Sequence, residues 1–251
     1  MAFLFVVFVL GLAFSSPHYV HAATTPTIVM PNIKIEGQAV KPKFFVIPMQ
    51  MLMLLSVLSL APYLLMMMTS FIRVTIVLSF IRSALGTQQV PPTQVLMGLA
   101  LFITFYIMAP VGKEINTQAI RPLMKGEISQ VDAFGRASSP VREFMLRQVQ
   151  REDLALFFDL AKLPRPKTRE DVPLYVLTPA FMVSEIKVGF EIGFLIYIPF
   201  LIIDMVVASV LMSMGMFMLS PMTISLPFKL LLFVMVDGWE LIIKGLILSF
   251  R

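Results

Sequence analysis

The stretch VGFEIGFLIYIPFLIIDMVVASVLMSMGMFM, residues 188–218, decides the fold class of this chain. Its charged residues are Glu191 and Asp204, and nearly all of its other positions are apolar or small. A helix needs about 20 such residues to cross the hydrocarbon core of a bilayer. The stretch is therefore long enough to span a membrane, and it predicts a helical membrane protein.

The composition of the whole chain agrees with this prediction. Of the 251 residues, 58% are hydrophobic and 14% are charged, and the mean hydropathy is +0.87. A soluble globular domain has about 25% charged residues. The net charge is +5, but basic and acidic residues are interspersed rather than clustered, so nucleic acid is not expected as a partner.

The N-terminus has the pattern of a secretory signal peptide. An apolar run too short to span, residues 1–14, precedes a polar stretch and the small-residue pattern that ends at Ala22. We expect cleavage after Ala22, which makes 1–22 the signal peptide and 23–43 a periplasmic lead-in. No Lys or Arg precedes the apolar run, so an uncleaved anchor is the alternative.

Residues 44–112 are expected to form a first hydrophobic helical hairpin. The uncharged runs Phe44–Met68 and Val90–Gly112 are each long enough to span. Pro48 and Pro62 are expected to kink the first run, because proline removes a backbone donor inside a helix. The turn between the runs is marked by Gly86, Pro91 and Pro92.

Residues 113–187 are expected to be a charged, helical, water-facing insertion, since they contain 12 basic and 10 acidic residues. Helical spacing covers Val141–Leu163, and the proline-rich run Leu163–Pro173 predicts a loop. A cleaved signal peptide places the mature N-terminus outside the cell membrane, and two crossings then make this insertion periplasmic. Counting basic residues favours the opposite side, but that rule weakens for loops longer than about 60 residues.

Residues 188–251 are expected to form a second hydrophobic hairpin, so hydropathy alone predicts four spans in the chain. Gly215, Pro221 and Pro227 interrupt the uncharged stretch Met205–Phe228. Such interruptions are typical of backbone buried in protein rather than in lipid. Charges also lie within or beside the apolar runs, namely Glu191, Asp204, Lys229, Asp237, Glu240 and Lys244.

Intramembrane charges usually form ion pairs or mark an ion pathway. The two histidines lie at 18 and 21, in the expected signal peptide, and no regular acidic ladder is present. Structural pairing is therefore favoured over a proton or ion relay. The same hairpin holds Gly189 and Gly193, whose spacing lets a second helix approach closely.

The segment Leu211–Met218 alternates methionine with serine and glycine. Methionine is flexible and fills irregular gaps, so a ring of such segments would give a deformable apolar collar. Ordinary lipid-facing or core methionine is the other interpretation.

Enzymatic chemistry is not expected. The chain has no cysteine, and removal of the signal peptide leaves no histidine. This excludes thiol and histidine nucleophile systems and nearly all transition-metal sites. No phosphate-binding glycine loop is present, and we expect no catalytic residues, no cofactor and no metal.

Two long motifs resemble the FliP family of secretion proteins. PAFMVSEIKVGFEIG, residues 179–193, and PFKLLLFVMVDGW, residues 227–239, are similar to the two signatures of that family. TSFIR at 69–73 and GTQQVPP at 86–92 are also typical of it. The resemblance covers the chain from about residue 44 to its C-terminus.

This resemblance implies an all-α protein that assembles with copies of itself and with FliQ-like and FliR-like subunits into a helical channel. The channel lies in the flagellar basal body of the bacterial inner membrane, with FlhA and FlhB among the other export proteins, and passes unfolded polypeptides. Its gate falls on Met216, Phe217 and Met218, where Phe217 replaces a frequent methionine. Glu185 and Lys229, each at the edge of an apolar run in a signature, are expected to pair between subunits.

Two alternatives to this role remain open at the level of sequence. One is an ion-conducting channel or motor subunit, or a generic membrane scaffold. The other is the homologous subunit of a virulence type III secretion system. The signal peptide and the long charged insertion favour the flagellar branch.

Overall fold

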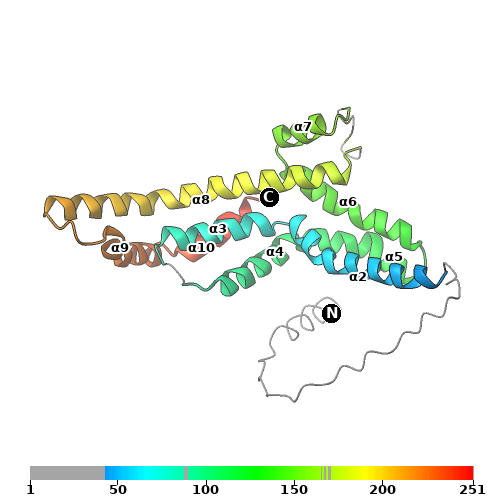
Figure 1. Cartoon of the computed structure of the whole chain (residues 1–251), viewed down its shortest axis with the longest axis horizontal. Helices are drawn as coiled ribbons and strands as arrows, with labels where there is room; N and C mark the ends of the chain where they lie inside the picture. The colour runs from blue at the N-terminus through cyan, green and yellow to red at the C-terminus, as the bar shows by residue number, and fades with distance from the viewer. Residues whose placement is uncertain (1–42, 88–89, 165, 167, 169–170, 251) are drawn as a thin grey trace, which may run out of the picture. The chain divides into compact units, whose positions relative to one another are not determined.

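The computed structural model describes residues 43–87, 90–164, 166, 168 and 171–250. Every regular element in these ranges is helical, as the sequence predicted (Figure 1). The expected signal peptide 1–22 lies outside the described residues, as does the lead-in up to residue 42. The chain divides into two compact units, residues 1–50 and 51–251.

The first half of the chain contains two apolar helices of more than 20 residues, α2 and α4, with the shorter α3 between them. The run predicted at 44–68 is helix α2, which continues through both Pro48 and Pro62. A π-helical turn, η1, joins α4 to α5, so one helical segment extends from Thr93 to Met124. The elements are α2 (Lys43–Met67), α3 (Phe71–Ala84), α4 (Thr93–Ile115), η1 (Asn116–Ile120) and α5 (Arg121–Met124).

The second half contains α6 and α7, the long helix α8, and two shorter helices, α9 and α10, which run back along α8. Helix α8 is 40 residues long, about 60 Å at the helical rise, and it contains Pro179 and Pro199. The expected break at Pro227 is absent, because α9 continues through that residue. The elements are α6 (Gln130–Gln148), α7 (Arg151–Leu160), α8 (Leu174–Ser213), α9 (Pro221–Met235) and α10 (Gly238–Leu248).

Two of the described helices are long and apolar enough to cross a membrane, Thr93–Met124 and Leu174–Ser213. Helices α9 and α10 are separate and have 15 and 11 residues, so neither alone reaches the length of a span. Hydropathy had suggested four spans. The insertion boundaries predicted at residues 113 and 187 both fall inside continuous helices, α4 and α8.

Helix α3 lies at the centre of the second unit. Its apolar residues Val74, Val77, Leu78 and Ile81 recur at helical spacing and are almost completely buried. They pack with residues of α4, α8, α9 and α10 in one core cluster. Figure 1 shows α3 alongside α8.

The two glycines of the GxxxG motif lie where α3 and α8 meet. A Cβ atom built on Gly193 would lie 2.5 Å from Cγ of Phe80, and one on Gly189 would lie 3.1 Å from Cγ2 of Ile76. Side chains at these positions would therefore collide with α3.

A second core joins α6 and α7 to the long helices. Phe144 and Met145 of α6 pack with Phe158 of α7 and with Leu177 and Phe181 of α8. The helix predicted over 141–163 is two helices, because the chain is extended at Val149 and Gln150. The amide of Gln150 donates to Ser184 Oγ at 3.0 Å, a tertiary contact that local sequence spacing does not show. None of the described residues between 163 and 173 is helical, as predicted.

Candidate functional site

The methionine-rich segment forms the loop between α8 and α9. Helix α8 ends in a Schellman motif: Gly215 has φ +75°, its amide donates to the Met212 carbonyl, and the Met216 amide donates to the Leu211 carbonyl at 2.9 Å. Pro221 begins α9 at a position where its missing amide hydrogen costs nothing. Gly215 and Pro221 thus bound the loop, as the sequence suggested. We call residues 214–220 the Met loop.

The side chains of the Met loop have little cover within the chain. Met218 is fully exposed, Phe217 is 79% exposed and Met216 is 43% exposed. A run of exposed apolar side chains of this kind marks a surface that another molecule covers.

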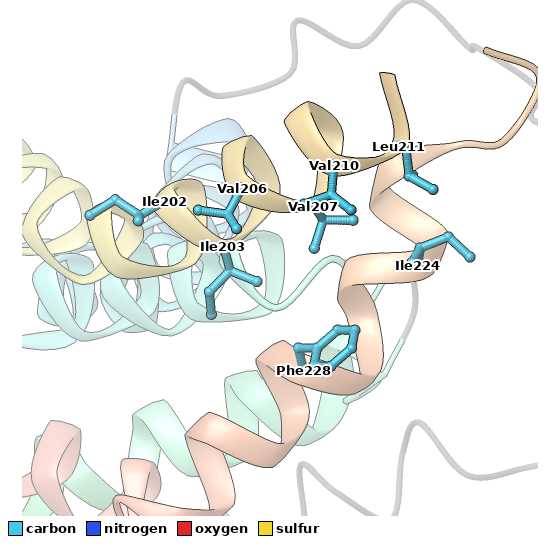
Figure 2. Close-up of a pocket in the computed structure, with 8 residues that line it drawn as sticks. All are labelled: Ile202, Ile203, Val206, Val207, Val210, Leu211, Ile224 and Phe228. Atoms are coloured by element: carbon cyan, nitrogen blue, oxygen red, sulfur yellow. The ribbon is translucent and has the colours of Figure 1, made fainter. Parts of the chain in front are cut away.

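An apolar groove lies at the foot of the Met loop (Figure 2). It encloses about 510 Å³ between α8 and α9. All of its lining residues are apolar: Ile202, Ile203, Val206, Val207, Val210, Leu211, Ile224 and Phe228.

Next to residues that line this groove, an ion pair ties three helices together; its lysine is buried and its aspartate is 26% exposed. Lys229 of α9 donates to Asp204 Oδ2 of α8 at 2.6 Å and to the Ala84 carbonyl at the end of α3 at 3.2 Å. Ser225 Oγ donates to the other oxygen of Asp204 at 2.5 Å. Each polar group therefore has a partner, as burial in an apolar setting requires.

A second buried ion pair connects the start of α3 to α8. Arg73 donates from Nε to Glu185 Oε2 at 2.9 Å and from Nη2 to Oε1 at 2.5 Å. This two-point contact holds both groups in one plane. Both side chains are buried.

The remaining donors of Arg73 hold the C-terminal end of the described chain. Its guanidinium donates to the carbonyl and hydroxyl of Ser249 at 3.1 and 3.2 Å, and to Gln148 Oε1 at 3.1 Å. The guanidinium carbon lies 3.8 Å from the centre of the Phe250 ring. Arg73 thus links α3, α6, α8 and the end of α10.

A third polar cluster fixes α7 on α8. Asp153 is buried and accepts hydrogen bonds from Ser184 Oγ, at 2.7 Å, and from Lys187 Nζ. Burial raises the pKa of Asp153, but the hydrogen bonds from Lys187 and Ser184 and the charge of Lys187 outweigh it. The pKa of this carboxyl therefore lies below its ordinary value.

The sequence predicts that Glu185 and Lys229 pair between neighbouring subunits; in the structure of the single chain each of them already has a partner of opposite charge. Within the chain, Glu185 pairs with Arg73 and Lys229 pairs with Asp204. Arg73 and Asp204 are visible in the sequence as charges near apolar runs, but their partners are 112 and 25 residues away along the chain.

The Met loop and its groove present apolar surface, and the charged residues beneath them are used in ion pairs within the chain. In the described ranges, no three His, Cys, Asp or Glu side chains gather as they would around a metal ion. The Met loop and the ion pairs instead define a class of membrane protein, in which long apolar helices are joined by internal ion pairs and an exposed apolar loop connects two of them.

Comparisons with known proteins identify the family within that class. The chain belongs to the FliP family, whose sequence model matches residues 54–246. The flagellar biosynthetic protein FliP of Bacillus subtilis is 58% identical over 201 residues, which cover 80% of this chain and 91% of that protein. The protein of the same name from Pectobacterium carotovorum is 50% identical over 241 residues, 96% of this chain and 91% of the relative. Another from Caulobacter vibrioides is 55% identical over 202 residues, 80% of this chain and 76% of the relative.

Proposed function

We propose that this chain, a FliP-family protein of flagellar biosynthesis, is a channel-forming subunit of the flagellar type III protein export gate. It passes unfolded flagellar polypeptides across the inner membrane. The observation that carries this proposal is the Met loop, an exposed apolar segment projecting from the ends of α8 and α9. The names of its relatives support the flagellar rather than the virulence system.

In this proposal the side chains of Met216, Phe217 and Met218 close the resting channel. Copies of the chain surround a lumen, and their Met loops meet at its narrowest point. An apolar constriction excludes water and with it small ions. Methionine side chains change conformation easily, so the same ring yields to a passing polypeptide and closes behind it.

The assembly contains FliQ-like and FliR-like subunits and lies beside FlhA and FlhB. The chain is made with a signal peptide that is removed after Ala22, and the region 113–187 faces the periplasm. The internal ion pairs give the subunit a rigid frame from which the Met loop projects. Arg73 pairs with Glu185 and Asp204 pairs with Lys229 inside the chain. Charges that neutralise each other in this way favour a structural role over an ion relay.

Site-specific crosslinking tests whether substrate passes the Met loop. The chain contains no cysteine, so Phe217→Cys introduces a single thiol at the proposed constriction. An export substrate with one cysteine and a folded C-terminal domain that stalls it should form a disulfide with this thiol. Leu160→Cys, on a side chain of α7 that is 69% exposed, is the matched control and should form none. Equal yields at both positions, or none at Phe217→Cys in an assembled complex, would contradict the proposal.

A further inference from the structure

Where α8 ends and α9 begins, the chain places five methionines within eleven residues. Four of them occupy alternate positions, Met212, Met214, Met216 and Met218, and the fifth is Met222. No Asp, Glu, His or Cys occurs between residues 205 and 228. Thiolate, imidazole and carboxylate sites are therefore excluded from this segment, but thioether sulfur remains as a metal donor.

The side chains of the four alternating methionines are little used in packing. They are between 43% and 100% exposed. Methionine that fills a gap in a core is buried, as Met145 is in this chain. The four side chains are therefore free to rotate toward an added ligand.

The Schellman motif that ends α8 gathers three of these methionines into one turn. The Gly215 amide donates to the Met212 carbonyl at 3.1 Å, and the Met216 amide donates to the Leu211 carbonyl at 2.9 Å. Met214 lies between these two hydrogen bonds, at the C-cap of α8. A methionine side chain has three rotatable bonds, so sulfur atoms from one such turn can approach a common point. Met218 follows two residues after Met216.

We propose that Met212, Met214, Met216 and Met218 together bind one soft monovalent cation, Cu(I), for which Ag(I) is a redox-stable probe. Thioether sulfur is soft and polarizable and selects Cu(I). Zn²⁺ instead prefers thiolate, imidazole or carboxylate ligands, and Mg²⁺ and Ca²⁺ prefer oxygen. The bound ion would draw the four side chains together and order the Met loop. This inference does not depend on whether the loop closes a channel.

Helix α2 supplies a matched set of methionines for comparison. Met49, Met51 and Met53 have the same alternate spacing and are 66–72% exposed. In a helix, residues two positions apart lie about 200° apart around the axis, so Met51 points away from the other two. Equal exposure and spacing without a turn should therefore give no tight site.

The first test is a calorimetric titration of silver nitrate, in chloride-free buffer, into the full chain purified in detergent. Leucine keeps the apolar character and approximate volume of methionine, so both variants should fold. We expect one tight Ag(I) site per unaltered chain, retained within about twofold in the α2 variant and lost in the loop variant. The α2 variant carries Met49→Leu, Met51→Leu and Met53→Leu, and the loop variant carries Met212→Leu, Met214→Leu, Met216→Leu and Met218→Leu.

A single replacement tests whether the turn assembles the ligands. Met216→Leu should weaken Ag(I) binding by at least about tenfold, because loss of a direct ligand should cost no less than loss of a group that merely orients one. No tight site in the unaltered chain, tight binding that survives in the loop variant, equal loss in the α2 variant, or unchanged affinity in Met216→Leu would each overturn the inference.

The second test uses pH and competing ions to identify the donor atoms. A thioether has no proton to lose on binding, so the affinity for Ag(I) should agree within about twofold at pH 7 and pH 5. Sites built on His18 or His21, the histidines of this sequence, would weaken at least about tenfold because imidazole is protonated at pH 5. Cu(I), added without oxygen, should displace Ag(I), and an excess of Zn²⁺ should not.

X-ray absorption of the Cu(I)-loaded chain reads the same donors directly. We expect sulfur neighbours in the unaltered chain and in the α2 variant, and none in the loop variant. Nitrogen or oxygen neighbours alone, a tenfold loss of affinity at pH 5, or displacement by Zn²⁺ would overturn the inference. These measurements involve neither export nor conductance, so their failure is distinct from failure of the proposed function.

Discussion

Lys229 donates simultaneously to the carboxylate of Asp204 and to the backbone carbonyl of Ala84, and so joins α9 to both α8 and α3. Its side chain is 3% exposed. The position of the Met loop, which connects α8 to α9, depends on this contact, because the pair holds the two helices together below the loop.

Removal of the carboxylate charge from this pair should destabilise the protein. Asp204→Asn keeps a hydrogen-bond acceptor for Ser225 but leaves the buried Lys229 ammonium without an anion, which typically costs about 3–5 kcal/mol. The double variant with Lys229→Met should recover most of that stability, because it leaves no unpaired charge. Thermal unfolding of the purified protein in detergent measures both.

The same variants distinguish a structural pair from an ion relay. If Asp204 carries protons, export stays defective in the double variant even when its stability is restored. Recovery of both stability and export is the result that a structural pair predicts. Lys125→Met, which breaks an exposed ion pair of 3.6 Å, is the control and should change stability by less than about 1 kcal/mol.

Arg73→Lys should be destabilising although it keeps the charge. Lysine lacks the planar fork that contacts both oxygens of Glu185, and it cannot also reach Ser249 and Gln148. A loss of at least about 1.5 kcal/mol is expected, the value of one hydrogen bond to a charged group. Arg82→Lys, at a half-buried arginine that donates to Thr93 Oγ1, should be close to neutral. Similar unfolding temperatures for the two variants would contradict the role assigned to Arg73.

Gly193→Ala should weaken the packing of α3 on α8. The added methyl group would overlap the ring of Phe80, and overpacking of this kind typically costs about 1–3 kcal/mol. Gly98→Ala is the matched control, because nothing lies within 4 Å of a Cβ atom at that helical position. Alanine there should stabilise by up to about 1 kcal/mol. Equal effects of the two substitutions would show that the close approach of the helices is not needed.

Acid should release α7 from α8. Because the pKa of Asp153 is lowered in the folded state, its contribution to stability is present above the ordinary aspartate pKa of about 4. That contribution is lost as the pH falls through the lower folded value. The protection of α7 against hydrogen exchange, corrected for the pH dependence of exchange in an unfolded chain, should therefore change little between about pH 7 and 5 and fall below about pH 4.

Asp153→Asn should lower this protection above about pH 4, by about 1–2 kcal/mol because Lys187 is half exposed, and should make little difference in stronger acid, where the contribution of Asp153 is already lost. Asp159→Asn, on the exposed side of the same helix, should leave the pH profile unchanged. An unaltered profile in Asp153→Asn would show that another group controls the docking of α7.

The long apolar runs and the two flanks of the Met loop could be predicted from the sequence, because both are local properties of the chain. The uncharged runs predicted α2 and α4, and Gly215 and Pro221 predicted where the loop begins and ends. The ion partners could not be predicted in this way. Arg73 and Glu185 are brought together by the packing of α3 on α8, which no spacing along the chain encodes.

The break between α6 and α7 illustrates the same limit. Helical spacing continues through Val149 and Gln150, but the backbone there is extended and the Gln150 amide is held by Ser184 of α8. Tertiary contacts also carry α8 across the predicted boundary at residue 187. The change in composition that predicted this boundary is therefore not accompanied by a break in the backbone.

The most direct measurement of the central claim is the ion conductance of complexes that carry Met216→Ala with Met218→Ala. The full complex is purified and placed in planar bilayers, and assembly is verified by its size. If the side chains of the Met loop seal the resting channel, the double variant conducts small ions, cells that make it become sensitive to salt, and Trp at either position slows export. Met124→Ala, at an 82% exposed methionine of α5, should leave the complex closed. Conductance of the assembled double variant at the level of the unaltered protein would show that the seal lies elsewhere.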